Sequence, residues 1–445
     1  MQQKTALAAF VGLVAAASGT AALAGEGFVD GSKATLKLRN FYINTDNRDS
    51  GTPKNQSYQE EWGQGFQLDL QSGYTEGTVG FGVDAIGLLG VRLDSGGGRH
   101  GNVTGGAYGG TVFPSDGREP VDDFSSLGVT AKAKVSKTEL RVGTLQPKLP
   151  VVSFNDGRLL PQTFEGVQVT SADVKDVLLT VGQIEHVKGR NSSNNEELSI
   201  AGANNSRTGQ FSNKFRYGGA DYQVNKDLLL QYYYGNLEDF YRQHFLGLVH
   251  NWAVGPGVLK TDLRYFNSRH DGANGHDSRW YTTGYYGGNQ TKGRVDNDLY
   301  SALFLYSWNG HTFGGGYQES RGDSDFPWLN QGDGSSNYTI TDSQIQKFGR
   351  AGERTWQARY AYDFAKVGIP GATAGVTYLK GVDIDTPAGA GKEWERDITV
   401  AYVVPEGVFK GLGVQVKNAT WRNDLAATRD QDETRVIFSY TLALK

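Results

Sequence analysis

The chain has 445 residues, of which 61 are glycine, one is methionine and none is cysteine, and its formal net charge is −4. The lack of cysteine excludes a disulfide scaffold, a thiolate zinc site and a cysteine nucleophile. Glycine is about twice as frequent as in ordinary proteins. Ample apolar and aromatic content with mixed charge argues against a disordered chain.

The first 24 residues are typical of a secretory signal peptide. Lys4 precedes an apolar stretch over 5–17, and Ala22-Leu23-Ala24 forms a small-x-small cleavage site. The apolar stretch is too short to span a bilayer as a helix. We therefore expect residues 1–24 to be cleaved on export and residues 25–445 to form a single mature domain.

The rest of the chain alternates apolar and polar residues with a period of two, which indicates strands with one apolar face. Segments 79–85, 127–135 and 435–442 show this most clearly. No later stretch has 18 consecutive apolar residues, so no membrane-spanning helix is expected. The pattern predicts eighteen strands, at 34–44, 62–73, 75–91, 124–135, 137–145, 164–172, 177–187, 214–223, 228–236, 241–252, 257–267, 296–308, 310–319, 353–364, 372–381, 395–404, 410–422 and 433–445.

The predicted connectors alternate between short turns and long loops, with 237–240 as a short exception where a long loop is due. This alternation is typical of outer-membrane barrels. Closure pairs every strand edge, as hydrocarbon requires, and eighteen strands leave an aqueous lumen. We predict an all-β fold: a closed 18-stranded antiparallel transmembrane β-barrel with short periplasmic turns and long extracellular loops. It would lie in the outer membrane of a Gram-negative bacterium, in contact with its lipid.

If the apolar positions face lipid, the alternate positions face the lumen. The basic residues among them are Lys37, Arg39, Arg92, Lys132, Lys134, Arg141, Arg359, Lys417 and Arg435, with Arg422 at the mouth. Acidic residues concentrate in the predicted loops. A basic lane favours the passage of anions, and the planar fork of arginine suits carboxylates. The alternative is that these charges only wet the lumen and pair with one another.

Segment 146–163 differs from an ordinary extracellular loop because it is apolar and contains three prolines, which prevent a regular strand. We predict that it folds into the barrel as a constriction and presents Asn155, Asp156 and Arg158 to the pore. The alternative is a loop that packs on the rim.

Several segments resemble the OprD family of substrate-specific outer-membrane porins. The matching segments are LRNFYIN (38–44), WGQGF (62–66), GTVGFGVDAIGLLG (77–90), SKTELRVGTLQP (136–147), RLLPQTFEG (158–166), LEDFYRQHFLG (237–247) and TWQARY (355–360). Within that family, 248–266 and 321–336 resemble the OprE type. The matches follow one another in the expected order over the whole mature chain.

The resemblance implies a monomeric or weakly oligomeric barrel with a narrow constriction and a ladder of basic residues that guides the carboxylate of small solutes, such as amino acids or aromatic acids. By motif, the ladder would comprise Arg39, Arg141, Arg158, Arg359, Lys417, Arg422 and Arg435. The family often has arginine where this chain has Gln415 and Lys417. We expect small anionic solutes and the barrel-assembly machinery as partners, and no cofactor, metal or nucleic acid.

Three alternatives to a carboxylate-selective porin can be tested. A general or neutral-sugar porin would present aromatic stacking tracks, for which Tyr232, Tyr233 and Tyr234 are available. A barrel-embedded serine hydrolase would need a histidine such as His186 beside an acid and a serine, but the sequence carries no HExxH or GxSxG motif. A purely structural barrel would bind surface partners through its long loops and would not conduct. We do not expect the chain to be an enzyme.

Overall fold

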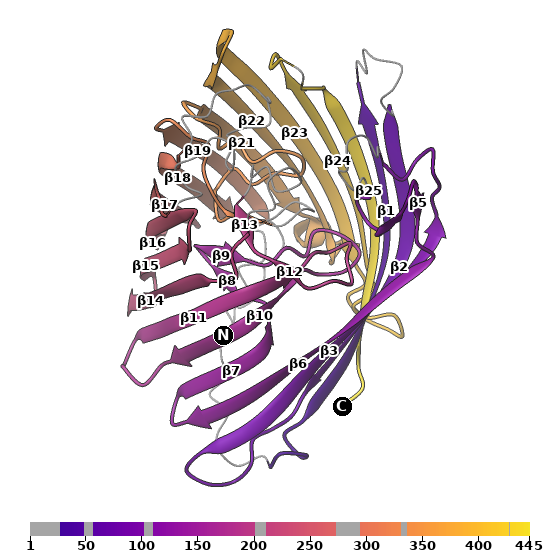
Figure 1. The fold of residues 1–445 in the computed structure, drawn as a ribbon. Helices are drawn as coiled ribbons and strands as arrows, with labels where there is room; N and C mark the ends of the chain where they lie inside the picture. Colours follow the sequence, from indigo (N-terminus) through magenta and orange to yellow (C-terminus); the bar gives the residue numbers. More distant parts are fainter. Residues whose placement is uncertain are drawn as a thin grey trace.

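The structure is a computed structural model that describes residues 27–48, 57–101, 110–200, 211–272, 294–330, 336–426 and 428–445. Eighteen long strands in it form one closed antiparallel barrel (Figure 1). They are β1 (Lys33–Asn47), β2 (Tyr58–Gln71), β3 (Gly80–Asp94), β6 (Asp123–Val135), β7 (Thr138–Leu145), β10 (Thr163–Ser171), β11 (Val177–Lys188), β14 (Phe215–Asn225), β15 (Leu228–Leu237), β16 (Tyr241–Val254), β17 (Gly257–His270), β18 (Asp296–Trp308), β19 (His311–Arg321), β21 (Arg354–Asp363), β22 (Ala372–Thr386), β23 (Gly389–Val403), β24 (Gly413–Asn423) and β25 (Gln431–Ala443).

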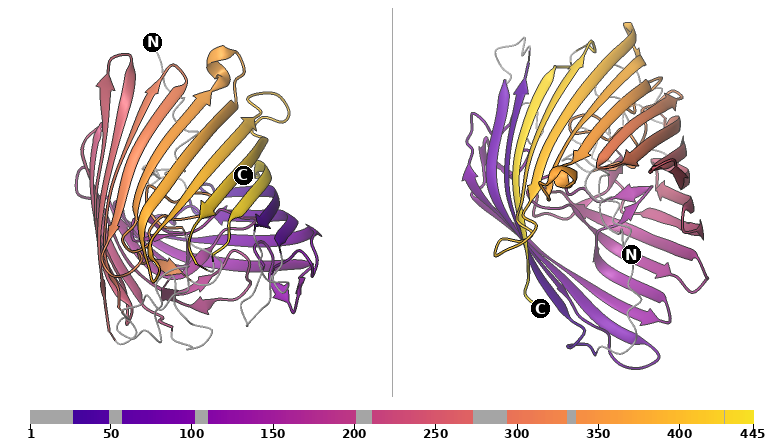
Figure 2. Two further views of the ribbon diagram at one scale, coloured as in Figure 1. Left: turned by 90° about the horizontal axis from the view of Figure 1, so that it is seen from above. Right: turned by 180° about the vertical axis from the view of Figure 1, so that it is seen from behind.

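Each long strand pairs with the next one along the chain, and the barrel closes where β25 pairs with β1. In that closing pair Thr35 lies opposite Ala443 and Asn47 lies opposite Gln431. Both views in Figure 2 show the strands curving round a common interior. The predicted number, order and antiparallel pairing of the strands are therefore confirmed. The predicted signal peptide, 1–24, lies outside the described residues.

The largest differences from the predicted strand boundaries lie before β3 and between β22 and β23. Residues 75–79 belong to a turn instead of a strand. The backbone N–H of Thr75 donates to the carbonyl oxygen of Phe81, and Gly77 has a φ of 126°. The expected long loop at 382–394 is instead a tight hairpin between β22 and β23. Gly389 and Gly391 belong to β23, Pro387 and Ala388 form the hairpin turn, and the pairing has a bulge between Gly381 and Ile384.

The outer wall carries the exposed apolar residues. Val83, Leu127 and Phe438 are 42%, 75% and 43% exposed, whereas inward-facing Lys132 is only 7% exposed. This confirms the predicted assignment of the two strand faces. In the part of the chain that the structure describes, none of the helices combines the length and apolarity needed to cross a membrane.

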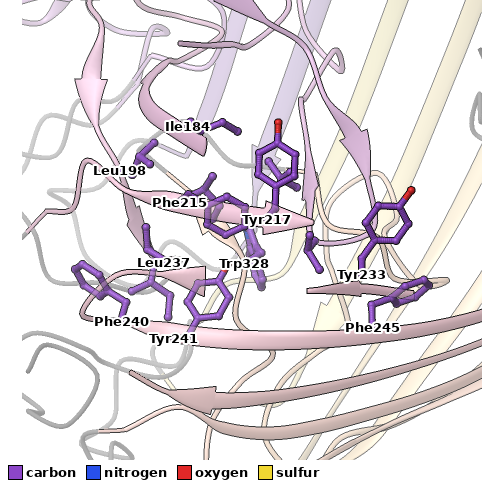
Figure 3. Packing of buried hydrophobic residues seen from close by; sticks show 14 of the residues in the cluster. Ile184, Leu198, Phe215, Tyr217, Tyr233, Leu237, Phe240, Tyr241, Phe245 and Trp328 are labelled. Atoms are coloured by element: carbon purple, nitrogen blue, oxygen red, sulfur yellow. The ribbon is translucent and has the colours of Figure 1, made fainter. Parts of the chain in front are cut away.

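The inner wall is not uniformly polar. On β14 to β17 it carries Phe215, Tyr233, Phe245 and Phe266, all with no exposed surface. Figure 3 shows several of these rings packed together with Trp328, which comes from the loop after β19. Apolar side chains at lumen-facing positions are stable here because chain folded into the barrel covers them.

In the described part of the chain, long loops from three places supply this inner layer. They follow β7, β11 and β19 and include the short strands β8 (Lys148–Leu149), β9 (Val152–Ser153), β12 (Glu196–Glu197), β13 (Ser199–Ile200) and β20 (Leu329–Asn330). Strand β8 pairs with β9, β13 pairs with β20, and Ser153 forms a bridge with Ser336, so the loops are linked to one another. Strands β8, β9 and β13 lie within the ring of long strands in Figure 1. Another pair, β4 (Ser115–Asp116) and β5 (Glu119–Pro120), lies in the loop after β3.

Candidate functional site

The loop between β7 and β10, 146–162, is folded against the inner wall at a place where β2 lacks side chains. A Cβ atom on Gly65 would lie 2.9 Å from the carbonyl oxygen of Leu159, and one on Gly63 would lie 2.9 Å from Leu159 Cδ2. Leu159 and Leu160 are 2% and 1% exposed and pack with Phe41 of β1. The glycines of the WGQGF segment therefore make room for loop 146–162, whereas the sequence had predicted only the inward fold of 146–163 and not the role of these glycines.

Arg39 of β1 holds the polar tip of the same loop. Its Nη1 donates hydrogen bonds to Asp156 Oδ1 at 2.7 Å and to the carbonyl oxygen of Arg158 at 2.7 Å, and its Nη2 donates to Asp156 Oδ2 at 3.1 Å. Asn155 Oδ1 accepts a hydrogen bond from Arg190 Nη1 at 3.1 Å. The Asp156 side chain remains 44% exposed. The structure thus brings Asn155, Asp156 and Arg158 to the lumen beside Arg39.

A second group of predicted residues lies nearby on β24 and β25. Lys417 lies directly across from Arg435, and Arg158 is close enough to interact electrostatically with Lys417. Arg435 donates to Glu433 Oε1 at 2.6 Å and to the carbonyl oxygen of Gln344 at 2.8 Å. Among the described residues, Lys417 has neither a hydrogen-bond partner nor a carboxylate within ion-pair distance. Lys417 is therefore a predicted lumen-lining basic residue whose charge remains available to a solute.

Sequence reasoning missed a second inward loop, 322–353, which packs against the inner face of strands between β17 and β25. Glu395 accepts backbone hydrogen bonds from Ile345 at 2.8 Å and Gln346 at 2.9 Å. Arg359 donates to the carbonyl oxygen of Ile340 at 2.6 Å. Arg359 therefore serves to hold this loop in place.

Arg264 of β17 is a further residue that sequence reasoning missed. It makes two 2.8 Å hydrogen bonds to Asp262 and donates to the carbonyl oxygen of Tyr338 at 2.9 Å. Its guanidinium carbon also lies 4.0 Å from the centre of the Tyr338 ring. The apolar run Phe326-Pro327-Trp328-Leu329, within a loop otherwise rich in Gly, Asp and Ser, was the available signal for an inward fold.

The lumen also contains carboxylates, which corrects the expected segregation of acids into loops. Glu395 and Glu433 are buried on the inner wall, as are Glu61 and Asp262. The sequence EWERD over 393–397 places its three acids on one face of β23, because side chains two apart share a face. The lumen is therefore a mixed surface in which most basic side chains are neutralised locally.

Arg141 lies apart from this group, on β7, four strands from β1 along the wall. It forms an ion pair with Glu139 and lies 3.9 Å from Asp84. Lys132 Nζ is 2.6 Å from Asp84 Oδ1. These residues form a second charged cluster on the inner wall, in which both cations have carboxylate partners.

Arg422 does not belong to the lumen. It lies five residues after inward-facing Lys417, so strand alternation turns it to the outer face. There it makes hydrogen bonds of 2.9 and 3.0 Å to the two carboxylate oxygens of Asp432. Its expected place in the basic ladder is therefore not supported by its position.

The loop after β19 ends on a buried acidic pair. Glu353 is 1% exposed, and Glu393 of β23 is also 1% exposed. Arg350 donates its Nε to Glu393 at 3.2 Å and its backbone N–H to Glu353 at 3.0 Å. Burial, reinforced by the Glu393 carboxylate, raises the pKa of Glu353 well above its usual value. Burial thus favours the uncharged form of the Glu353 carboxyl.

The features named for the hydrolase alternative are not assembled around His186. Its Nδ1 lies 3.9 Å from Glu165 Oε2, and no hydrogen bond from it to a described serine is present. A different group, at the loop after β3, has the order of contacts of a triad. His100 Nδ1 is 2.7 Å from Glu61 Oε1, and His100 Nε2 is 2.7 Å from Ser115 Oγ.

The His100 group is best explained as a structural anchor. Both His100 and Glu61 have no exposed surface. Glu61 Oε2 accepts hydrogen bonds from the backbone of Thr111 and Val112, each at 2.8 Å. These bonds fasten the loop after β3 to β2, and burial separates the histidine from solvent.

The tyrosines named for the sugar alternative do not form a track along the lumen. Tyr233 faces inward but has no exposed surface, because the inner loops cover it. Tyr232 is 45% exposed on the outer face, where its hydroxyl lies 3.0 Å from His244 Nδ1. Tyr234 lies on the same face, with its ring 4.9 Å from His244.

Comparison with known proteins gives a consistent result. Residues 26–444 match the model of the outer membrane porin, OprD family. The porin-like protein GalP of Pseudomonas putida is 37% identical, with 94% of each chain aligned.

Solved structures agree with this match. OccK8 (OprE) of Pseudomonas aeruginosa is 62% identical with a TM-score of 0.85, over 94% of this chain and all of that one. OpdK of the same organism, in a structure with vanillate, is 37% identical with a TM-score of 0.81, over 94% and 100% of the two chains. The OccK8 match confirms the resemblance to the OprE type that the sequence suggested.

Proposed function

Because the chain belongs to the OprD family of outer membrane porins, we propose that it mediates passive diffusion of small carboxylate-bearing solutes, such as amino acids or aromatic acids. The solute would pass between the inward loop 146–162 and the wall formed by β1, β24 and β25. Lys417 is the residue that would take the carboxylate, with Arg39, Arg158 and Arg435 setting a positive surrounding field.

The observation that carries this proposal is the ammonium of Lys417, which has no hydrogen-bond or ion-pair partner among the described residues, whereas its neighbours are paired. Arg39 and Arg435 are held by Asp156 and Glu433, so their charge is partly balanced. A carboxylate that replaces water at Lys417 gains a charge-assisted hydrogen bond without breaking one inside the protein. A weak, single contact of this kind also allows release, which a diffusion channel requires.

The relative solved with vanillate supports an aromatic carboxylate as one class of solute, since vanillate is an aromatic acid. The alternative function is a general or neutral-sugar porin. The covered position of Tyr233 and the outward position of Tyr232 count against an aromatic sugar track.

Uptake by liposomes tests this proposal with matched solutes. Vesicles that contain the protein should take up benzoate faster than benzamide, which has the same ring but no charge. A panel of amino acids and small organic acids then ranks the solutes. Equal rates for benzoate and benzamide would favour a general porin, and no uptake of either solute would favour a purely structural barrel.

Export and assembly also belong to the proposal. We propose that cleavage after Ala24 yields the mature porin, that the barrel-assembly machinery inserts it, and that it works as a monomer or a weak oligomer. Mass measurement of the protein isolated from outer membranes tests the cleavage site. Cross-linking in the same membranes tests the oligomeric state.

A further inference from the structure

The outer face of β21 to β24 carries a group of cationic and aromatic side chains at the end of the strands nearest the long loops. Cross-strand registers place Trp356, Lys380 and Trp394 in one row. Tyr378 and Arg396 form the next row toward the opposite end. Figure 1 shows these four strands side by side in orange and yellow. We refer to these five residues as the outer patch.

The outer patch lies where an outer leaflet would meet water. Along β23 the outward positions beyond Arg396 are Ile398, Val400 and Tyr402, which are 39%, 54% and 41% exposed and form the apolar band. Trp356 is 62% exposed, and the rings of Tyr378 and Trp394 stack at 5.8 Å. Long loops mark the extracellular side of such barrels, and aromatic girdles mark the interface.

Most other cations at this level have carboxylate partners. Arg354 is paired with Asp383, and Arg422 with Asp432. Arg321 lies 2.7 Å from Glu319.

Lys380 and Arg396 differ from these neighbours. Both are exposed, and within the described ranges neither has a carboxylate within ion-pair distance. The one hydrogen bond of Arg396 is to Thr420 Oγ1, at 3.0 Å. The outer patch therefore has two positive charges that no carboxylate among the described residues balances.

The two charges are close enough to share one ligand. Lys380 lies opposite Trp394 and Arg396 lies opposite Tyr378, so Lys380 and Arg396 are diagonal neighbours on adjacent strands. Such neighbours are separated by about 7–8 Å at their Cα atoms, within reach of long side chains. A phosphate offers several acceptor oxygens and can bridge an ammonium and a guanidinium.

We propose that the outer patch binds the phosphate group of a phosphorylated glycolipid in the outer leaflet. Lys380 and Arg396 would hold the phosphate, while Trp356 and the stacked pair Tyr378–Trp394 would pack against the sugar and the start of the acyl chains. The ligand balances two charges that would otherwise lie uncompensated beside the lipid. Residues that conduct solutes take no part, so this site is independent of the transport proposal.

Native mass spectrometry of the full-length protein in detergent tests the proposal, with hexa-acylated bisphosphoryl lipid A as the probe and its enzymatically dephosphorylated form as the comparison. The wild type should retain the bisphosphoryl form preferentially. The double variant Lys380→Gln/Arg396→Gln should bind it about thirtyfold more weakly, on the scale of two cations acting at an anionic surface. The dephosphorylated form should not distinguish the two proteins.

The matched control removes two exposed lysines from the short turns at the other end of the barrel, Lys366 and Lys410, by the substitution Lys366→Gln/Lys410→Gln. This control should bind like the wild type, and the exchange variant Lys380→Arg/Arg396→Lys should also retain binding. Equal affinity of the wild type and Lys380→Gln/Arg396→Gln, or equal affinity for both lipid forms, would overturn the proposal. Heat-shifted migration on gels confirms that every variant is folded before binding is compared.

Discussion

Substitution of Lys417 by glutamine changes the charge of the lumen beside the proposed solute path. The charges acting on Lys417 include Arg158, Arg435, Asp397 and Glu433. With Lys417 itself, these groups contribute three positive charges against two carboxylates. The variant Lys417→Gln removes the surplus while keeping a polar side chain of similar length.

The size of the effect follows from the position of the ammonium. At 4 Å, an anion gains about 1 kcal/mol from a unit charge in water and about 4 kcal/mol at an effective dielectric constant of 20. The half-buried ammonium at a wet lumen lies between these limits. Even the smaller value corresponds to about a fivefold change in the anion-to-cation permeability ratio.

Reversal potentials across planar bilayers in a salt gradient measure this ratio directly. Lys417→Gln should lower the preference for anions about fivefold or more, and Lys417→Arg should keep it. Lys410→Gln removes the same charge from an exposed turn outside the lumen and serves as the control. An anion-to-cation permeability ratio in Lys417→Gln equal to that of the control would refute the claim that the Lys417 charge acts on passing anions.

Three further predictions concern the inner loops and a turn. Gly65→Leu should displace Leu159 and raise single-channel conductance, because the added Cβ would lie only 2.9 Å from the carbonyl oxygen of Leu159, closer than van der Waals contact. Unchanged conductance would show that the position of the loop does not depend on this glycine. Glu353→Gln should keep the wild-type free energy of unfolding in urea because burial favours the uncharged form of the native carboxyl. Glu353→Ala should lower that free energy by about 1–3 kcal/mol through lost hydrogen bonding, and equal losses in both variants would contradict this. Hydrogen bonds from Ser136 and Thr138 lower the pKa of Asp173 from 3.8 to about 2. The ionised Asp173 therefore stabilises the fold above pH 3.8, and this effect is lost as the pH falls toward 2. The melting temperatures of wild type and Asp173→Asn should converge over that range, and a constant difference would argue against the interaction.

Most of the barrel could be predicted because lipid imposes a strict rule on each strand. Apolar and polar side chains must alternate wherever one face of a strand meets hydrocarbon. The strand predicted at 296–308 therefore has the same bounds as β18. The rule weakens beyond the membrane. The hairpin between β22 and β23 extends past the apolar band, where alternation no longer marks strands and Pro387 suggests a loop.

The site was predicted in part for a similar reason. Strand parity correctly placed Arg39, Lys417 and Arg435 in the lumen, since it depends only on position within a strand. It could not show which of them carry a partner, because Asp156 and Gln344 arrive from loops distant in sequence. Arg422 was placed in the lumen by its motif alone, and this was wrong because it lies an odd number of residues after inward-facing Lys417 and therefore faces outward.

A crystal structure of the protein soaked with 4-bromobenzoate tests the central claim most directly. Anomalous scattering locates the bromine without ambiguity. We expect the aromatic acid in the lumen beside loop 146–162, with its carboxylate within hydrogen-bond distance of Lys417 Nζ. Bromine sites confined to the outer wall or the surface loops, with the lumen empty at saturating concentration, would contradict it.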